Sequence, residues 1–274
     1  MFRCVKVAFV VVLFLGPSAP LAISQAAGTQ DWASLDRQAD ESYTRGDLKE
    51  AIRIARLAVA AASNPKQSGR SLDRLGFFEF TSGNLKDGES FLRQSLEVRK
   101  TKLGIDTADY AESANDLALF CRDSGRLPEA REMAEQAGAI RSRVFGGQHP
   151  RVAESLNTLG SIYALRGEYD PAISRFEEAR AIHESQPKPR DFSEEYGTLC
   201  VNLAGTYQRI GRYAKAEVLF EKGLDVLRKK PGVNHPAYSA SLVAFAYLQA
   251  DLGRYARAEK LYDESGKLLR EQLR

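Results

Sequence analysis

Gly211-Arg-Tyr-Ala-Lys-Ala216 and Gly253-Arg-Tyr-Ala-Arg-Ala258 are two copies of the motif that decides the fold, a glycine followed five residues later by a small residue. The motif occurs six times, and successive glycines are 37, 42, 42, 44 and 42 residues apart. A fixed period of this length is typical of a repeat array. Because repeat arrays present long surfaces, the pattern predicts a protein that holds a partner. The other copies are Gly46-Asp-Leu-Lys-Glu-Ala51, Gly83-Asn-Leu-Lys-Asp-Gly88, Gly125-Arg-Leu-Pro-Glu-Ala130 and Gly167-Glu-Tyr-Asp-Pro-Ala172.

Apolar residues recur at helical spacing on both sides of each glycine. In the fourth copy, Leu156, Leu159 and Ile162 precede the glycine, and Ile173 and Phe176 follow it. Such spacing indicates two amphipathic helices. Glycine suits the left-handed residue that ends a helix, so each repeat is predicted to be a helix, a tight turn and a second helix. The fold class is therefore all-α.

Small residues stand at two fixed places in every repeat, seven positions before the glycine and five positions after it. A larger side chain at a helix crossing would overpack it, so these positions predict where the two helices touch. The twelve residues are Ala39, Gly76, Ala118, Gly160, Ala204 and Ala246 before the glycines, and Ala51, Gly88, Ala130, Ala172, Ala216 and Ala258 after them.

The full pattern resembles the tetratricopeptide repeat (TPR). It combines the small residue, the glycine, a Tyr or Leu two places on and the Ala, followed by an aromatic such as Phe176, Phe220 or Tyr262. That repeat is usually 34 residues long. The interval of 42 and the segments that begin at Leu103 and Gly147 resemble the longer variant of kinesin light chains. The resemblance implies a right-handed α-solenoid of about six helix-turn-helix units over residues 31–274.

The first 26 residues differ from the repeats. Arg3 and Lys6 precede an unbroken apolar run from Val7 to Leu15, which Gly16 and Pro17 end. This order is typical of a secretory signal peptide and predicts a secreted or periplasmic protein. The alternative is an uncleaved membrane anchor or a membrane-tethered assembly factor, although a bilayer span needs about 20 apolar residues.

The net charge of the chain limits the kinds of partner that it can bind. The chain carries a net charge of +3, and loss of residues 1–26 would remove two of these positive charges, those of Arg3 and Lys6. A nearly neutral protein lacks the basic field of a nucleic-acid binder, so we expect a protein or peptide partner.

Cys121 and Cys200 lie two repeats apart, too far for a disulfide, and are expected to be buried. The alternative is a thiol exposed in the groove.

The resemblance also implies that the first helix of each repeat lines a concave face. Positions ten, six, three and two before each glycine would then point into the groove. An Asn can pair with an extended backbone, an Arg with a carboxylate, and aromatics can serve as anchors. The alternative is that the asparagines bond neighbouring repeats and the aromatics pack on adjacent helices. The candidate groove residues are Asn115, Asn157, Arg122, Arg209, Gln208, Phe77 and Tyr247.

Asp36 and Asp73 occupy equivalent positions in the first two repeats and predict an acidic end of the groove. Such an end argues against a clamp for a terminal carboxylate. Together with the basic middle, it favours an extended ligand of mixed charge.

Catalytic chemistry finds no support in the sequence. The three histidines, His149, His183 and His235, are far apart and show no metal-ligand spacing. No glycine-rich phosphate loop or Gly-x-Ser-x-Gly motif occurs. We therefore expect no enzyme activity, no cofactor and no small-molecule substrate.

The last predicted helix runs from about Tyr255 to Leu273 and has no later repeat to cover it. Its leucines, Leu261, Leu268 and Leu269 among them, predict either a homodimer through this helix or a helix that folds back on its neighbour. The predicted function is a scaffold that binds a protein or an extended peptide in the concave groove. The alternatives are a peptide-sensing regulatory TPR protein and an enzyme with a cryptic site.

Overall fold

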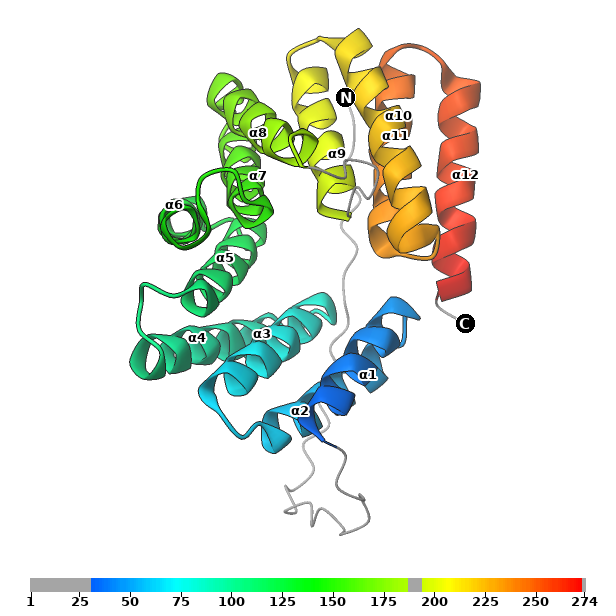
Figure 1. The fold of residues 1–274 in the computed structure, drawn as a ribbon. Helices are drawn as coiled ribbons and strands as arrows, with labels where there is room; N and C mark the ends of the chain where they lie inside the picture. The colour runs from blue at the N-terminus through cyan, green and yellow to red at the C-terminus, as the bar shows by residue number, and fades with distance from the viewer. Residues whose placement is uncertain (1–30, 187–193, 273–274) are drawn as a thin grey trace. The chain divides into compact units, whose positions relative to one another are not determined.

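The computed structural model describes residues 31–186 and 194–272, and residues 31–274 form one compact unit. Every regular element in the described part is helical, and Figure 1 shows the helices following one another as pairs. The helices are α1 (Trp32–Thr44), α2 (Leu48–Ala61), α3 (Pro65–Thr81), α4 (Leu85–Lys102), α5 (Ala108–Asp123), α6 (Leu127–Phe145), α7 (Pro150–Leu165), α8 (Tyr169–Glu184), α9 (Glu194–Arg209), α10 (Tyr213–Leu227), a short π-helical turn η1 (Arg228–Gly232), α11 (Pro236–Asp251) and α12 (Tyr255–Gln272).

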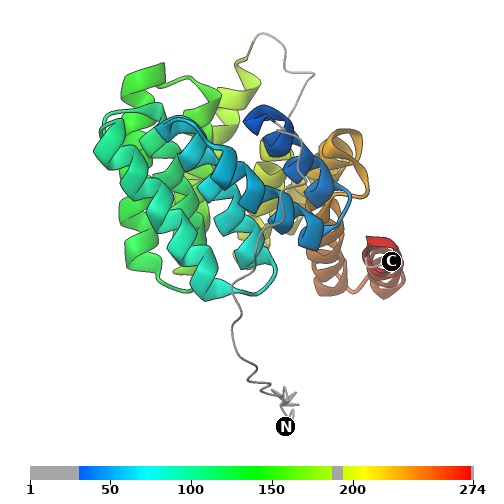
Figure 2. The ribbon, with the colours of Figure 1, turned by 90° about the horizontal axis from the view of Figure 1, so that it is seen from below.

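Each odd-numbered helix packs against the even-numbered helix that follows it, and each pair then packs against the next. The same succession of paired helices is visible after a rotation of 90° (Figure 2). In Figure 1, α5, α7 and α9 lie on the inner side of the curve, and α6 and α8 lie outside them. The predicted all-α solenoid of six helix-turn-helix units is confirmed.

The six motif glycines make the turns within the pairs. Their φ angles lie between 72° and 89°, in the left-handed region that only glycine adopts without strain. At Gly167, the N–H donates to the carbonyl of Ala164 and the next N–H, of Glu168, donates to the carbonyl of Tyr163. These bonds satisfy carbonyls at the end of α7 and let α8 begin at once.

The two small residues of each repeat meet where its helices cross. All twelve are buried, and the alanines among them are at most 4% exposed. A Cβ added to Gly160 would lie 2.6 Å from a ring carbon of Phe176, and one added to Gly88 would lie 3.0 Å from the carbonyl oxygen of Gly76. The predicted register of the helix crossings is therefore confirmed.

Histidine and proline open two of the inner helices. His149 is the N-cap of α7, and its Nδ1 accepts a hydrogen bond of 3.2 Å from the N–H of Arg151. His235 does the same for α11 at 3.3 Å. A proline follows each histidine in the first turn, where the missing N–H costs nothing. These two histidines therefore have a structural role.

Candidate functional site

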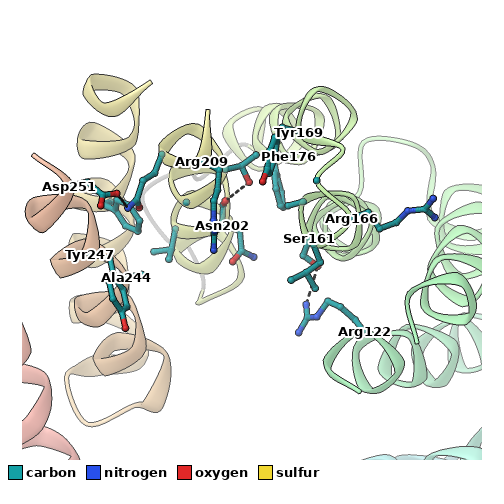
Figure 3. Close-up of a pocket in the computed structure, with 18 of the residues that line it drawn as sticks. Arg122, Ser161, Arg166, Tyr169, Phe176, Asn202, Arg209, Ala244, Tyr247 and Asp251 are labelled. Carbon is teal, nitrogen blue, oxygen red and sulfur yellow. Dashed lines mark hydrogen bonds between the residues drawn. The ribbon is translucent and has the colours of Figure 1, made fainter. Parts of the chain in front are cut away.

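A groove of about 1200 Å³ lies among the inner helices of the later repeats. It is lined by residues of α5, α7, α9 and α11 and by a few residues of α8 and α10. Figure 3 shows Arg122, Ser161, Asn202 and Tyr247 among the side chains around it. Its charged and aromatic lining residues are Arg122, Asp123, Arg166, Arg209, Asp251, Tyr169, Phe176, Tyr213, Phe220 and Tyr247.

The groove follows the glycine register over several repeats. The positions six, three and two before the glycine line it on α7 and on α9. They are Ser161, Ala164 and Leu165 on α7, and Gly205, Gln208 and Arg209 on α9. Of the seven candidate residues, Arg122, Gln208, Arg209 and Tyr247 are among the lining residues, whereas Asn115, Asn157 and Phe77 are not.

The two asparagines lie in the seams between neighbouring inner helices. Asn115 is only 6% exposed, and its Oδ1 accepts a 3.2 Å hydrogen bond from the hydroxyl of Thr158 on α7. Asn157 is half-buried, and its Oδ1 accepts a 3.1 Å bond from Nδ2 of Asn202 on α9. Position ten therefore faces the adjacent helix more than the open groove, so the alternative of bonds between repeats describes both residues.

Phe77 lies outside the lining of the groove. It is 46% exposed on α3, and its ring meets the edge of Tyr43 with centroids 5.3 Å apart. Tyr247 is 59% exposed on α11, and its ring meets Tyr262 of α12 edge-on at 5.8 Å. Each of the two rings thus contacts a neighbouring aromatic ring and still exposes much of its surface to solvent.

Most charges in the groove are already paired. Arg122 donates to both carboxylate oxygens of Asp123, at 2.7 and 3.0 Å, and to the hydroxyl of Ser161 at 3.1 Å. Arg166 is paired with Glu168 at 2.7 Å. Nε2 of Gln208 donates to Asp251 at 2.6 Å, a bond that spans two inner helices.

Arg209 differs from the other lining cations. Its side chain is exposed at the end of α9, and the described residues offer it neither a hydrogen bond nor an ion pair. Guanidinium groups pair strongly with planar anions, and Arg209 is the lining arginine that has no such partner within the described residues.

Four polar or glycine positions stand out among the lining residues that were not candidates from the sequence. Tyr169 and Tyr213 stand two places after their glycines and follow the turn into the groove, and Asn202 and Gly205 lie on the groove face of α9. The tyrosines were visible as part of the repeat pattern. Asn202 was missed because it stands nine, not ten, positions before its glycine.

The predicted acidic end of the groove is wrong. Asp36 is only 4% exposed and pairs with Arg70 at 3.0 Å and with Arg74. Asp73 is 7% exposed and pairs with Arg99 at 3.0 Å. Both carboxylates therefore join neighbouring helices and are withdrawn from any ligand.

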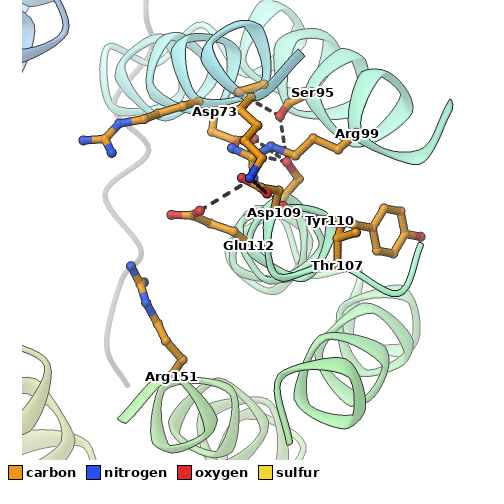
Figure 4. A network of polar contacts seen from close by, with 12 residues as sticks. Asp73, Ser95, Arg99, Thr107, Asp109, Tyr110, Glu112 and Arg151 are labelled. Carbon is orange, nitrogen blue, oxygen red and sulfur yellow. Dashed lines mark hydrogen bonds and ion pairs between the residues drawn. The ribbon is translucent and has the colours of Figure 1, made fainter. Parts of the chain in front are cut away.

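Figure 4 shows the network around Asp73, in which side chains of α3, α4 and α5 converge. The hydroxyl of Ser113 donates to Asp73 at 3.0 Å and lies 2.7 Å from that of Ser95. Arg99 is 1% exposed and also donates to the backbone carbonyl of Asp109. Burial raises the pKa of Asp73 to about 6, although the guanidinium of Arg99 opposes this shift.

The described residues hold no cluster of three or more metal-ligating side chains. Cys121 and Cys200 are free thiols, and both are fully buried, as predicted. Burial raises the pKa of each thiol to about 11, which leaves neither reactive at neutral pH.

The last helix is partly covered. Leu261 and Leu268 pack against the core cluster of the final repeats, which matches the alternative in which the helix folds back. Tyr255 and Leu269 remain 71% and 45% exposed, whereas Leu273 lies outside the described residues.

Comparison with known families identifies the class of protein that this fold and groove define. The tetratricopeptide repeat model matches residues 67–142, 109–185 and 197–271, which is more than half of the chain. The chain belongs to the tetratricopeptide repeat family. Proteins of this fold typically act as scaffolds with extended binding surfaces and not as enzymes.

Among curated proteins, the chain is similar to clustered mitochondria protein homologs of fungi. It is 27% identical over 165 residues to that of Ajellomyces capsulatus, which covers 58% of this chain and 13% of the relative. It is 25% identical over 190 residues to that of Aspergillus niger, which covers 67% of this chain and 15% of the relative. The chain thus spans only a small part of the length of these relatives.

Solved structures share the fold. A kinesin light chain protein of Podosopora anserina with nearly identical TPR-like repeats is 22% identical, with a TM-score of 0.55 over 78% of this chain and 100% of that one. Rap protein complexed with competence and sporulation factor is 14% identical, with a TM-score of 0.64 over 91% of this chain and 77% of that one. NprR in complex with its cognate peptide NprX is 14% identical, with a TM-score of 0.62 over 86% and 66%.

The comparison with curated relatives contradicts the secreted or periplasmic location that the sequence suggested. These relatives are fungal clustered mitochondria protein homologs, and none of them is named as an exported protein. The predicted signal peptide, residues 1–26, and its alternative as a membrane anchor lie outside the described residues. Within residues 31–186 and 194–272, no helix has the length and apolar character needed to cross a membrane.

Proposed function

We propose that this protein is a scaffold that holds an extended segment of a partner protein in the groove formed by α5, α7, α9 and α11. The observation that carries the proposal is the groove itself, a hollow of about 1200 Å³ with one free cation and an exposed aromatic ring. Pockets for drug-sized ligands have volumes of about 300 to 1,000 Å³. The groove is larger than that, so it has room for a peptide segment. NprR, which shares the fold, is complexed with a peptide.

Two amides suit a peptide backbone: Asn202 lines the groove, and Asn157 lies beside it in the seam between α7 and α9. Asn202 uses Nδ2 to bond Oδ1 of Asn157, so Oδ1 of Asn202 and Nδ2 of Asn157 have no hydrogen bond within the described residues. Each of these groups can take a backbone N–H or C=O of an extended segment. The pair would fix the direction of the bound chain.

Aromatic side chains complete the surface. Tyr247 is 59% exposed and Tyr213 is 37% exposed, and both line the groove. Tyrosines contribute much of the binding energy in protein interfaces because they bury a large rigid area and keep a polar tip. Side chains of the partner segment would pack against them.

The experiment that tests this function replaces Asn157 and Arg209 together by Ala and measures binding of the native partner by surface plasmon resonance. We expect a loss of affinity of at least tenfold. The matched control is Val218→Ala, since Val218 is 65% exposed on α10 and does not line the groove. If the double variant binds as the wild type does and the control does not, the partner lies elsewhere.

A second proposal concerns α12 and a second copy of this chain. Tyr262 is 38% exposed and Leu269 is 45% exposed, whereas the equivalent Phe220 and Leu227 of the preceding repeat are fully buried. Tyr262 and Gly266 alternate large and small along this face, which would allow two antiparallel copies to interlock.

Light scattering tests the dimer. The wild type is expected at twice the monomer mass, and Tyr255→Asp with Leu269→Asp at the monomer mass. Val218→Asp removes an equally exposed apolar residue away from α12 and should leave the dimer intact. A wild-type monomer at micromolar concentration would refute it.

A further inference from the structure

Gly205 lies in the middle of α9, where glycine has no packing role. A glycine inside a helix is less favourable than alanine by roughly 1 kcal/mol. Seven other glycines inside helices have a neighbouring atom within 3.4 Å of an added Cβ, and Gly266 has one at 3.7 Å; the seven are Gly69, Gly76, Gly88, Gly138, Gly160, Gly197 and Gly223. An added Cβ on Gly205 would meet nothing within 4 Å, although Gly205 lines the groove.

The other repeats carry a side chain at the position of Gly205, six residues before the motif glycine. The equivalents are Asp40, Phe77, Leu119, Ser161 and Tyr247. Only Ser161, on the adjacent inner helix, is also small, and it also lines the groove. The backbone of α9 is therefore bare at the centre of the groove, next to a second shallow position on α7.

Asn202, Gly205 and Arg209 are three and four residues apart and share one face of α9. Figure 3 shows Asn202 and Arg209 on this face, with Tyr247 and Asp251 on the neighbouring helix. The carboxylates of the groove are occupied, because Arg122 pairs with Asp123 and Gln208 bonds Asp251. No carboxylate of the described residues pairs with Arg209.

We infer that Gly205 and Arg209 form a subsite for a carboxylate-bearing residue of the bound segment. The missing side chain lets the main chain of the ligand approach α9, and the guanidinium of Arg209 then pairs with an Asp or Glu side chain or with a C-terminal carboxylate. This inference rests on the proposed function of the groove. It adds the charge class of the ligand and the residue that admits it.

The probe is a library of random dodecapeptides displayed on phage with both ends joined to the coat protein, so that only side chains supply carboxylates. A second library of synthetic dodecapeptides, prepared as free acids and as amides, tests the C-terminal carboxylate. Both libraries are selected on the full chain, and the affinities of the best peptides are measured by isothermal titration calorimetry.

Three variants separate the subsite from the fold. Arg209→Glu reverses the charge, Gly205→Leu fills the bare position, and Gly205→Ala reports whether the helix tolerates a side chain there. Val218→Leu is the control, because it enlarges an exposed side chain of α10 that does not line the groove. We expect Gly205→Ala to keep or raise the melting temperature.

The inference predicts selected peptides with Asp or Glu at one position, or free acids that bind at least tenfold more tightly than their amides. Arg209→Glu should select Lys or Arg at that position, and Gly205→Leu should weaken the best peptide at least tenfold while Val218→Leu leaves it unchanged. Peptides that bind the groove without any carboxylate preference would overturn the inference and leave the proposed function intact. Failure to select any peptide would overturn both.

Discussion

The two halves of the solenoid use equivalent polar positions in opposite ways. In the first repeats, Asp36 and Asp73 stand ten residues before their glycines and are sealed into ion pairs with arginines of neighbouring helices. In the later repeats, Asn157 occupies that position beside the groove and Arg209 projects from α9 without a partner in the described residues. The early repeats use these polar groups in ion pairs between helices, whereas the later repeats leave Arg209 without such a partner in the described residues.

This difference implies that arginines of the two halves have different effects when they are removed. Arg99 is 1% exposed and pairs with Asp73, so Arg99→Ala would leave a buried carboxylate without its partner. We expect a loss of stability of about 3 to 5 kcal/mol in chemical denaturation. Arg209→Ala should change stability by no more than about 0.5 kcal/mol. Equal effects of the two variants would contradict the division.

The pH dependence of stability sharpens the same division. The folded pKa of Asp73 is raised from 3.8 to about 6, so the folded state binds the proton more tightly than the unfolded state. The contribution of Asp73 to the free energy of unfolding is therefore greatest below pH 4 and is lost as the pH rises from 4 to 6. The loss is at most about 3 kcal/mol at 1.36 kcal/mol per pKa unit.

Asp73→Asn removes this titration and provides the control. The free energy of unfolding of the wild type should fall relative to that of Asp73→Asn between pH 4 and pH 7. A wild type that gains stability over the variant in this range would show that the ion pair with Arg99 outweighs burial.

Gly160 and Gly205 lie on successive inner helices, but Gly160 is closely packed and Gly205 faces open space. Gly160→Leu would drive a side chain into the ring of Phe176, whereas Gly205→Leu enters empty space. Overpacking costs about 1 to 3 kcal/mol, so we expect a clearly lower melting temperature for the Gly160 variant alone. Matching melting temperatures would show that one of the two environments is misassigned.

The smallest expected effect concerns the thiols. Cys121 and Cys200 lie on inner helices, α5 and α9, yet both are fully buried with pKa values raised to about 11. At pH 8 only about a thousandth of each thiol is ionised. Labelling with a disulfide reagent should therefore be slow in the folded protein and should become complete in denaturant. Rapid labelling of Cys200 at pH 8 would mean that the core behind the groove opens.

The arrangement of the helices could be predicted well from the sequence, because few residues other than glycine and alanine fit a left-handed turn or a close helix crossing. A left-handed turn requires Gly167, and a close helix crossing requires Gly160, so the motif alone placed both helices and their inner face. Arg122, Gln208, Arg209 and Tyr247 could be placed in the groove from that register.

The remaining differences arise from contacts between repeats. Asp73 was expected to face a ligand, but Arg99, whose long side chain reaches it from α4, cannot be recognised as its partner from spacing alone. Asn115 is similarly held by Thr158 of the next inner helix. Gly205 could not be recognised for another reason, because a glycine in a helix offers no side chain whose chemistry points to a ligand.

The most direct test of the account compares a photo-reactive benzoylphenylalanine at position 165 with one at position 218. Leu165 lines the groove and is 60% exposed, whereas Val218 is 65% exposed and does not line it. After irradiation in the presence of the native partner, the account predicts cross-links from position 165 to one short segment of the partner and none from position 218. Cross-links from position 218 alone would contradict it.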